Sequence, residues 1–328
     1  MKIICSKSSL LKSVSIALKA VPSKTTMPIL ECILMDATTN QIKFTTNDME
    51  LGIETIVEGT IEEKGKVALD AKIFYEIIRR LPDNDVTIKT DDKYAATITC
   101  EKAKFNIPGK SGEDFAYLPI IEKDEPLTIS QYTLKEMIRQ TIFSIAVNEN
   151  NKLMTGELFE IKNNCLKVVS LDGHRIAIRK MPLKREYSDR KVVVPGKTLS
   201  EVSKILSGEV DDQVSIYFTK NHILFEFDQT MVVSRLIEGE YFRIDQMLSS
   251  DYETKLKINK KEFLDCIDRA TLLVREVDKK PIIINITDDD MELRIDSAMG
   301  SMNEEIDIEK EGKDIMIGFN PKLSLIHI

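Results

Sequence analysis

Apolar residues recur with a helical spacing at three places along the chain. In each place they stand at i, i+4, i+7, i+8 and i+11, which puts them on one face of an amphipathic helix. The three sets begin at Leu10, Leu134 and Phe263, so they are 124 and 129 residues apart. We therefore predict three related helices in a chain that repeats one unit three times.

The segments that follow these helices also repeat. Residues 28–48, 153–174 and 281–297 alternate apolar and polar positions around a turn that contains Asn or Asp, which predicts antiparallel strands. A further strand and a second helix come next, as in residues 66–81, KVALDAKIFYEIIRRL. The first two units then close with more paired strands. Each unit is predicted to be an α+β domain in which two helices pack on antiparallel sheets.

A repeat of about 125 residues is long enough for each unit to have its own core. Short, polar and acidic linkers at 120–126 and 249–253 indicate three domains, at residues 1–122, 123–250 and 251–328. The third copy stops within its second helix, and its last residues, LSLIHI, lack the polar face of the matching helices. We expect the natural chain to continue for about 40 residues, and the origin of LSLIHI is left open.

The composition fits a globular protein in solution. Hydrophobic residues make up 42% and charged residues 30% of the 328, and no apolar run is long enough to cross a bilayer. The N-terminus lacks the features of a secretory signal, so a cytoplasmic location is expected. The five cysteines form no CxxC or Cys/His cluster, which favours buried free thiols and predicts neither a metal site nor a cofactor.

The segment SLDGHRIAI, residues 170–178, concentrates reactive side chains. A catalytic interpretation takes Ser170 as nucleophile, with Asp172 and His174 as acid and base. Neighbouring residues of a strand point in alternating directions, however, and no glycine-framed nucleophile elbow surrounds the serine, so catalysis is not expected. A turn at Asp172 after a strand over 166–171 is the structural alternative. It leaves open why histidine, arginine and an apolar residue follow the turn.

Seven sequence blocks, in order on the triple repeat, carry a resemblance to a known family: MPIL at 27–30, TNDMELGI at 46–53, TGELFE at 155–160, LDGHRIA at 171–177, VVVP at 192–195, LIEGEY at 236–241 and IGFNPK at 317–322. The chain resembles the beta subunit of bacterial DNA polymerase III, the sliding clamp. The resemblance implies a clamp fold whose three domains form an arc, half of a head-to-tail homodimeric ring around duplex DNA. It also implies a non-catalytic processivity factor.

A net charge of -8 argues, by itself, against a nucleic-acid partner. The predicted helices have the opposite charge balance. They lie at 7–21, 70–82, 130–146, 195–207 and 259–275, and together they contain 14 Lys or Arg and 7 Asp or Glu. If these helices line the ring, as the resemblance implies, their cations contact phosphates without reading base sequence. The residues expected to face DNA are Lys12, Lys19, Lys24, Arg79, Arg80, Lys135, Arg139, Lys197, Lys204 and Arg269.

The resemblance also implies a groove between the second and third domains that binds short peptides. The expected partners are the polymerase III alpha subunit, the clamp loader and other proteins with clamp-binding peptides. The expected pocket residues are Met154, Leu171, Gly173, His174, Arg175, Ile176, Phe242, Gln246 and Met247. The stretch Phe242-Arg243-Ile244-Asp245 departs from the family's usual sequence after EGEY, so the pocket rim is expected to differ here.

Ring closure requires a second interface. By position in the family, Phe105 and Ile107 of domain 1 are expected to meet Leu272 and Leu273 of domain 3 in a second chain. Glu304 and Glu305 are candidate acidic partners for Lys72 or Lys104. Ordinary core packing is the alternative for the two leucines.

Two other functional classes stay open at this point. One is an enzyme with an active site around His174, and the other is a repeat scaffold that binds only proteins. Alanine substitutions at His174 and Arg175 distinguish the clamp from the enzyme, because the clamp loses peptide binding and has no chemical activity to lose. Retention on circular but not on linear DNA distinguishes the clamp from the protein-only scaffold.

Overall fold

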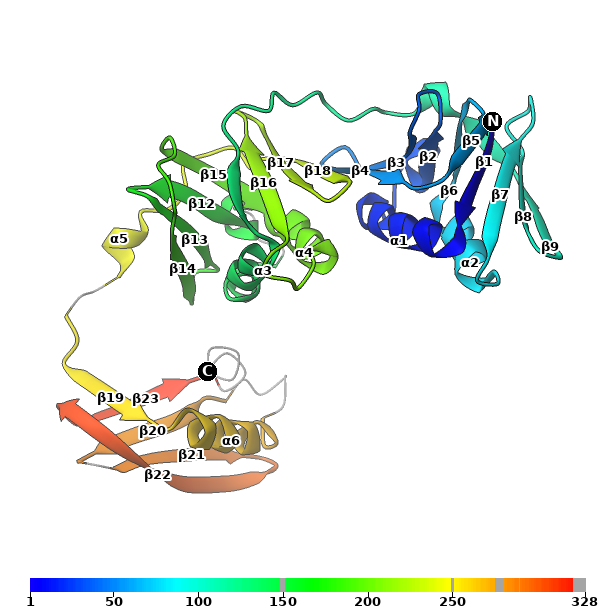
Figure 1. Ribbon diagram of the computed structural model, residues 1–328. Coiled ribbons are helices and arrows are strands. Elements are labelled where there is room, and N and C mark those ends of the chain that lie inside the picture. The colour runs from blue at the N-terminus through cyan, green and yellow to red at the C-terminus, as the bar shows by residue number, and fades with distance from the viewer. Residues whose placement is uncertain (148–150, 249–250, 275–279, 289, 321–328) are drawn as a thin grey trace. The chain divides into compact units, whose positions relative to one another are not determined.

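The structure, a computed structural model, describes residues 1–147, 151–248, 251–274, 280–288 and 290–320. It divides into two compact units, unit 1 (Met1–Tyr241) and unit 2 (Phe242–Ile328). Figure 1 shows the helices and strands of each unit. In the described part of the chain, no helix is long and apolar enough to cross a membrane.

The first half of unit 1 follows the predicted order of helix, strands, helix and strands. Its elements are β1 (Lys2–Ser6), α1 (Lys7–Ala17), η1 (Leu18–Ala20), η2 (Pro28–Glu31), β2 (Cys32–Asp36), β3 (Ile42–Asn47), β4 (Leu51–Val57), β5 (Thr60–Glu63), β6 (Lys66–Asp70), α2 (Ala71–Arg80), β7 (Asp85–Thr90), β8 (Ala96–Cys100), β9 (Ala103–Ile107), β10 (Gly109–Ser111) and η3 (Gly112–Asp114). One core cluster, which contains Leu10, Phe44 and Phe74, joins α1 and α2 to the strands.

The second half of unit 1 repeats this order. Its elements are β11 (Leu127–Ser130), α3 (Gln131–Arg139), η4 (Ile142–Ser144), η5 (Lys152–Thr155), β12 (Gly156–Lys162), β13 (Cys165–Leu171), β14 (Ile176–Pro182), β15 (Arg190–Pro195), α4 (Gly196–Ile205), β16 (Gln213–Phe218), β17 (His222–Phe227) and β18 (Thr230–Arg235). Leu134, Phe159 and Phe225 belong to its core, which also takes in Leu51 and Ile53 of β4.

Unit 2 begins with the short helix α5 (Ile244–Met247). Its other elements are β19 (Thr254–Ile258), α6 (Lys260–Thr271), β20 (Ile282–Thr287), β21 (Asp290–Ser297), β22 (Gly300–Gly312) and β23 (Ile315–Phe319). These strands form one sheet in the order β19-β22-β21-β20-β23, and α6 packs on it through Cys266, Ile267 and Ala270. The terminal segment LSLIHI lies outside the described residues.

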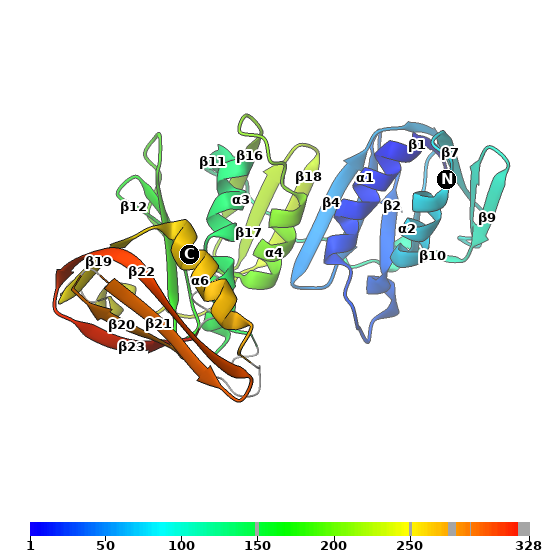
Figure 2. The same cartoon turned by 90° about the horizontal axis from the view of Figure 1, so that it is seen from below.

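A nine-stranded sheet holds the two halves of unit 1 together. Its order is β10-β6-β2-β3-β4-β18-β17-β16-β11, so the antiparallel pair β4 and β18 connects the first repeat to the second. The Thr55 and Thr230 hydroxyls, paired across this junction, are 2.9 Å apart and buried. Figure 2 shows α1, α2, α3 and α4 of unit 1 in front of the strands. The sheet thus gives the four helices a common support.

The repeat extends to the conformation of single turns. Asp48 accepts hydrogen bonds from the N–H groups of Glu50 and Leu51, and Asp172 accepts the corresponding bonds from His174 and Arg175. The residue after each aspartate has a positive φ, 76° at Met49 and 86° at Gly173. The predicted turn at Asp172 is therefore confirmed, and domain 1 contains its counterpart.

The helix predicted over 130–146 is shorter in the structure. α3 ends at Arg139, and the 3-10 turn η4 follows it. At Thr141 the backbone leaves the helical conformation (φ −127°), and the hydroxyl lies 2.8 Å from the Met137 carbonyl oxygen. A threonine hydroxyl bonded to the preceding turn bends or ends a helix. The chain then packs η4 against β13 and β14.

Candidate functional site

The four helices of unit 1 are rich in cations. α1 to α4 together contain nine Lys or Arg and three Glu, although the whole chain has a net charge of -8. Because these helices lie in front of the strands in Figure 2, the excess positive charge is concentrated on one side of unit 1. This is the kind of surface that attracts a polyanion.

The ten cations expected to face DNA differ in their partners. Six are ion-paired: Arg79 and Arg80 with Glu76, Arg139 with Glu136, Lys197 with Asp48, Lys204 with Glu201, and Arg269 with Glu304. Lys135 donates to the Leu206 carbonyl at 3.1 Å. Lys12, Lys19 and Lys24 have no ion pair with any described residue. Lys12 lies on α1, Lys19 on η1, and Lys24 in the segment after η1. These three are therefore the most available to an external anion.

The SLDGHRIAI segment does not assemble a catalytic trio. Ser170 is fully buried at the end of β13, and its hydroxyl donates to the Thr141 carbonyl. Asp172 is committed to its turn and to Arg175, whose Nε lies 2.9 Å from the Asp172 carboxylate. His174 is exposed on the turn. Serine and histidine thus have different surroundings because the turn at Asp172 lies between them, whereas strand alternation alone would put residues four apart on the same face.

The unit 1 residues expected to bind a peptide, apart from Met154 on η5, belong to this turn or to the adjoining ends of β13 and β14. Leu171 is buried, Met154 and Ile176 are half-buried, and Gly173 is open to solvent, since a methyl group at its Cα would have no other atom within 4 Å. The Arg175 guanidinium stacks 5.7 Å from the centre of the Phe143 ring. Its Nη1 is buried and has no hydrogen-bond partner among the described residues. The half-buried Ile176 and the exposed His174 at this turn suit a peptide with apolar anchors and a polar group.

The remaining three predicted pocket residues belong to unit 2. Phe242 precedes α5, and Gln246 and Met247 lie on it. Ile244, part of the stretch that departs from the family, is buried within this short helix. Met247 has 53% of its surface exposed, and Leu248 next to it is similarly exposed. α5 and the residue after it thus expose two large apolar side chains.

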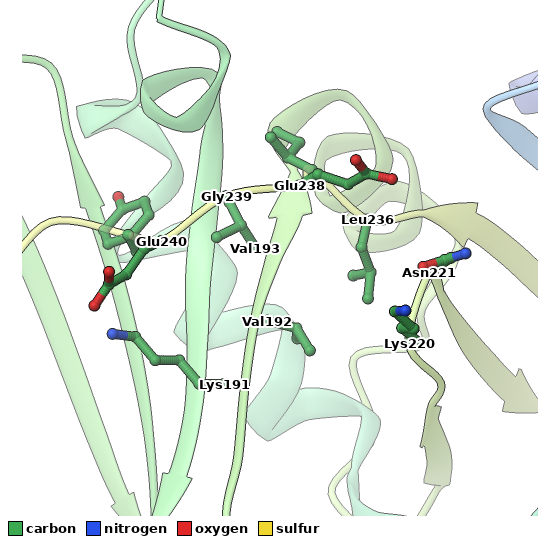
Figure 3. A pocket seen from close by; sticks show the side chains of 11 residues that line it. Lys191, Val192, Val193, Lys220, Asn221, Leu236, Glu238, Gly239 and Glu240 are labelled. Atoms are coloured by element: carbon green, nitrogen blue, oxygen red, sulfur yellow. The ribbon is translucent and has the colours of Figure 1, made fainter.

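A groove of about 690 Å³ lies in unit 1 beside β15. Figure 3 shows Lys191, Val192 and Val193 on one side and the segment from Leu236 to Glu240 on the other. The Ile237 N–H donates to the Val193 carbonyl and ties this segment to β15. The segment continues to Tyr241, which is buried and whose hydroxyl lies 3.4 Å from the Val169 carbonyl oxygen on β13.

The residues expected at the ring-closing interface are partly exposed. Phe105 lies on β9, the edge strand of its sheet, with 39% of its surface exposed, whereas Ile107 packs partly on the core. Leu272 at the end of α6 is 76% exposed, and Leu273 packs against the core of unit 2. Ordinary core packing, the alternative interpretation, thus applies to Leu273 and not to Leu272. Glu304 is already paired with Arg269 of its own unit.

A fully buried glutamate, Glu157 on β12, was not among the residues expected from the sequence. Burial raises its pKa to about 8, and a hydrogen bond with Thr141 opposes this rise. The sequence contained the signal for this burial. Glu157 stands two residues before Phe159 and four before Ile161, so all three side chains lie on the same, inward face of the strand. A glutamate in such a position is rare enough to indicate a special role.

Three domain families match the chain. They are described as the N-terminal, central and C-terminal domains of the DNA polymerase III beta subunit, and they match residues 1–119, 128–242 and 245–325. The beta sliding clamp of Staphylococcus aureus is 35% identical over 315 residues, which cover 93% of this chain and 83% of that protein.

Solved structures agree with these matches. A putative DNA polymerase III beta subunit from Eubacterium rectale is 69% identical, with a TM-score of 0.98, and the DNA polymerase sliding clamp from Bacillus subtilis is 34% identical, with a TM-score of 0.96. Each alignment covers 100% of this chain and 89% of the other. The predicted clamp fold with three α+β domains is confirmed. The chain belongs to the DNA polymerase III beta subunit family, the bacterial sliding clamps.

Proposed function

We propose that this protein encircles duplex DNA as a ring and holds a replicative polymerase on its template. Sliding clamps are non-catalytic processivity factors, so the prediction that the chain is not an enzyme stands on its family. The observation that carries the proposal is the concentration of cations on the helices of unit 1 in an otherwise acidic chain. Such contacts bind the phosphate backbone without sequence specificity, which permits sliding.

The test is retention on DNA of different topology. The chain is loaded onto nicked circular duplex by a clamp loader and ATP, and unbound protein is removed by gel filtration. A ring stays on the circle and is lost when a restriction enzyme linearises it, whereas an ordinary DNA-binding protein stays on both. Equal retention on circular and linear DNA would contradict encirclement.

We further propose that the surface around the 170–178 segment docks peptides from the polymerase III alpha subunit, the clamp loader and other partners. Met154, Leu171 and Gly173 to Ile176 form the part contributed by unit 1, and Phe242, Gln246 and Met247 contribute from unit 2. Support comes from His174, which is exposed, and from the apolar residues Met154 and Ile176, which are half-buried. Alanine at both His174 and Arg175 is expected to weaken polymerase binding at least tenfold while leaving the far-ultraviolet circular dichroism unchanged.

The homodimer is proposed to close through Phe105 and Ile107 of one chain and Leu272 and Leu273 of its partner. The exposed edge strand β9 and the exposed Leu272 support this pairing. Analytical ultracentrifugation tests it, because Leu272→Asp is expected to shift a dimer to monomer and Leu248→Asp, also exposed, is not. The domain boundaries at 1–122, 123–250 and 251–328, and the cytoplasmic location, stay predictions.

A further inference from the structure

A cluster of buried polar groups lies at the start of β12. The Oε2 atom of Glu157 is 3.1 Å from Thr141 Oγ1, and its Oε1 has no hydrogen-bond partner among the described residues. Ser144 Oγ on η4 is also buried without a partner in the same part of the chain, and Ser170 Oγ donates to the Thr141 carbonyl at 2.5 Å. Glu157, Thr141, Ser144 and Ser170 are each fully buried, so the cluster is shielded from bulk solvent.

The hydrogen bonds leave the Glu157 carboxyl group with little to stabilise a charge. The Thr141 hydroxyl has one hydrogen, and three acceptors lie within reach of it: the Met137 carbonyl at 2.8 Å, the Ile138 carbonyl at 3.3 Å and Glu157 Oε2 at 3.1 Å. Glu157 therefore shares this donor with two backbone carbonyls, and its Oε1 has no partner among the described residues. A buried carboxylate needs several donors or a cation, so the geometry fits a neutral Glu157.

Among the described residues, no cation acts on Glu157 to favour its ionised form. Thr141 donates to Glu157, Ser170 of β13 donates to the Thr141 carbonyl, and β15 places Val194 opposite Glu157. The other titratable group is the Tyr241 phenol, whose pKa is raised by burial first and by the Glu157 charge second. Burial without a counter-ion is the main cause that raises the pKa of Glu157 to about 8.

Each neighbour of this carboxyl group is connected to the proposed peptide-docking surface. Ser170 precedes Leu171, and the Phe143 ring, which lies between Thr141 and Ser144 in the sequence, supports the Arg175 guanidinium. The Met154 carbonyl accepts from the Ala146 N–H at 2.8 Å, just after η4. Displacement of η4 would therefore move both the arginine support and the Met154 backbone.

We propose that neutral Glu157 is a positioning residue for the peptide-docking surface, holding η4 against β12 and β13, and that loss of its proton releases η4 and weakens peptide binding. This inference rests on the proposed peptide-docking function. An ionised carboxylate would have one shared donor here, so its charge would have to be solvated at a position that the fold buries. Peptide affinity then follows the fraction of protein in which Glu157 is protonated.

Peptide affinity as a function of pH tests the inference. The probe is a fluorescein-labelled pentapeptide with one polar residue followed by leucine and phenylalanine anchors and no titratable side chain, measured by anisotropy with the full chain from pH 7 to pH 9. Wild type is expected to lose about tenfold in affinity, because roughly one-tenth of the carboxyl groups stay protonated one unit above their pKa. Glu157→Gln keeps an oxygen that accepts from Thr141 and carries no charge, so its peptide affinity is expected to equal that of wild type at pH 7 and to change little up to pH 9.

Glu160→Gln is the matched control, since Glu160 lies on the same strand and pairs with Lys167 at its surface. It is expected to keep the wild-type pH profile. The same pH profile in wild type and Glu157→Gln would overturn the inference.

A second measurement separates this inference from the peptide-docking proposal. The ¹³C-methyl NMR signal of Met154, assigned with a Met154→Leu variant, is expected to shift with a midpoint near pH 8 in free wild-type protein and not in Glu157→Gln. If the methyl signal titrates but the peptide binds no variant, the docking proposal fails and the positioning role of Glu157 stands. A Met154 signal that does not respond to pH in wild type overturns the inference, whatever the peptide does.

Discussion

At the scale of single residues, Glu157 is expected to make the stability of the protein depend on pH. The folded state keeps a proton up to about pH 8, whereas the unfolded chain releases it near pH 4.5. The folded state thus binds more protons between these values, so the free energy of unfolding falls as pH rises through this range and levels off above it. Glu157→Gln lacks this linkage.

The expected difference is large enough to measure. Between pH 6 and pH 9, the stability of Glu157→Gln relative to wild type is expected to grow by about 2 to 3 kcal/mol, at up to about 1.36 kcal/mol for each unit over which the proton is lost only from the unfolded chain. Urea unfolding at pH 6, 7.5 and 9 provides the measurement. A constant offset between the two proteins would show that Glu157 is ionised in the folded state.

The local pattern around Asp172 and Glu157 shows what a sequence reveals about single residues. The turn at Asp172 could be predicted because aspartate before glycine bonds local N–H groups whatever surrounds it. The alternation in β12 also places Glu157 inside. Its partner Thr141, however, lies 16 residues away on another element, and no local rule brings those two side chains together. The proton on Glu157 therefore follows from packing and not from the sequence pattern.

At the scale of elements, the cap of α2 is expected to determine how well that helix forms. Asp70 accepts a hydrogen bond from the Ile73 N–H at 2.8 Å at the start of the helix. Asp70→Ala is expected to lower the free energy of unfolding by about 1 kcal/mol, and Asp70→Ser to restore most of it, because serine is also a good N-cap. Thermal unfolding of the three proteins checks this order. Equal losses for alanine and serine would contradict it.

The junction between β4 and β18 offers a double-mutant cycle. Thr55 and Thr230 share one buried hydrogen bond across the pair of strands. Either single valine substitution leaves the other hydroxyl without a partner, at an expected cost of about 1–3 kcal/mol, whereas the double substitution removes both polar groups and is expected to be nearly neutral. Urea unfolding of the four proteins measures the coupling. Simple additivity of the two single effects would refute the expectation.

The elements themselves could largely be predicted, but their ends and partners could not. Period-two alternation predicted the strands β2 and β3 and the closing strands β16 to β18, since it depends only on which face of a strand is buried. β4 pairs with β18, and this brings Thr55 next to Thr230, which lies 175 residues later in the chain. Such a pairing depends on how two domains meet, and alternation does not encode that. The early end of α3 likewise depends on where the Thr141 hydroxyl bonds. The helical spacing of its apolar residues continues past this point.

At the scale of the whole molecule, the net charge and the distribution of charge support opposite conclusions. The total of -8 suggests no affinity for DNA, whereas the excess of cations on α1 to α4 suggests the reverse. The helical repeat resolves the conflict, because it repeats basic positions on elements that share one side of unit 1. Many of these cations form ion pairs within the protein, and these pairs were not identified from the sequence. A count of charges does not show which oppositely charged residues, three or four positions apart on a helix, pair with each other.

These internal ion pairs are expected to divide the cations into two groups with different effects on DNA binding. Lys12, Lys19 and Lys24 have no ion pair to break among the described residues, whereas Arg79, Arg139 and Lys204 each pair with a glutamate on the same helix. A phosphate contact by either group releases a counter-ion from DNA. Arg79, Arg139 and Lys204, however, must first break an ion pair with a glutamate, and the three lysines need not.

Replacing the first three lysines with glutamine is expected to reduce the slope of log K against log salt for linear duplex by about 2 to 3, close to about 0.9 for each lost phosphate contact. The matched triple glutamine variant of the paired cations is expected to change the slope by less than half as much, because those side chains contribute fewer direct contacts. Filter binding or anisotropy at several salt concentrations, with the full chain, measures both slopes. Equal slopes for the two variants would mean that the ion pairs open freely on DNA and that only the total charge of the helices matters.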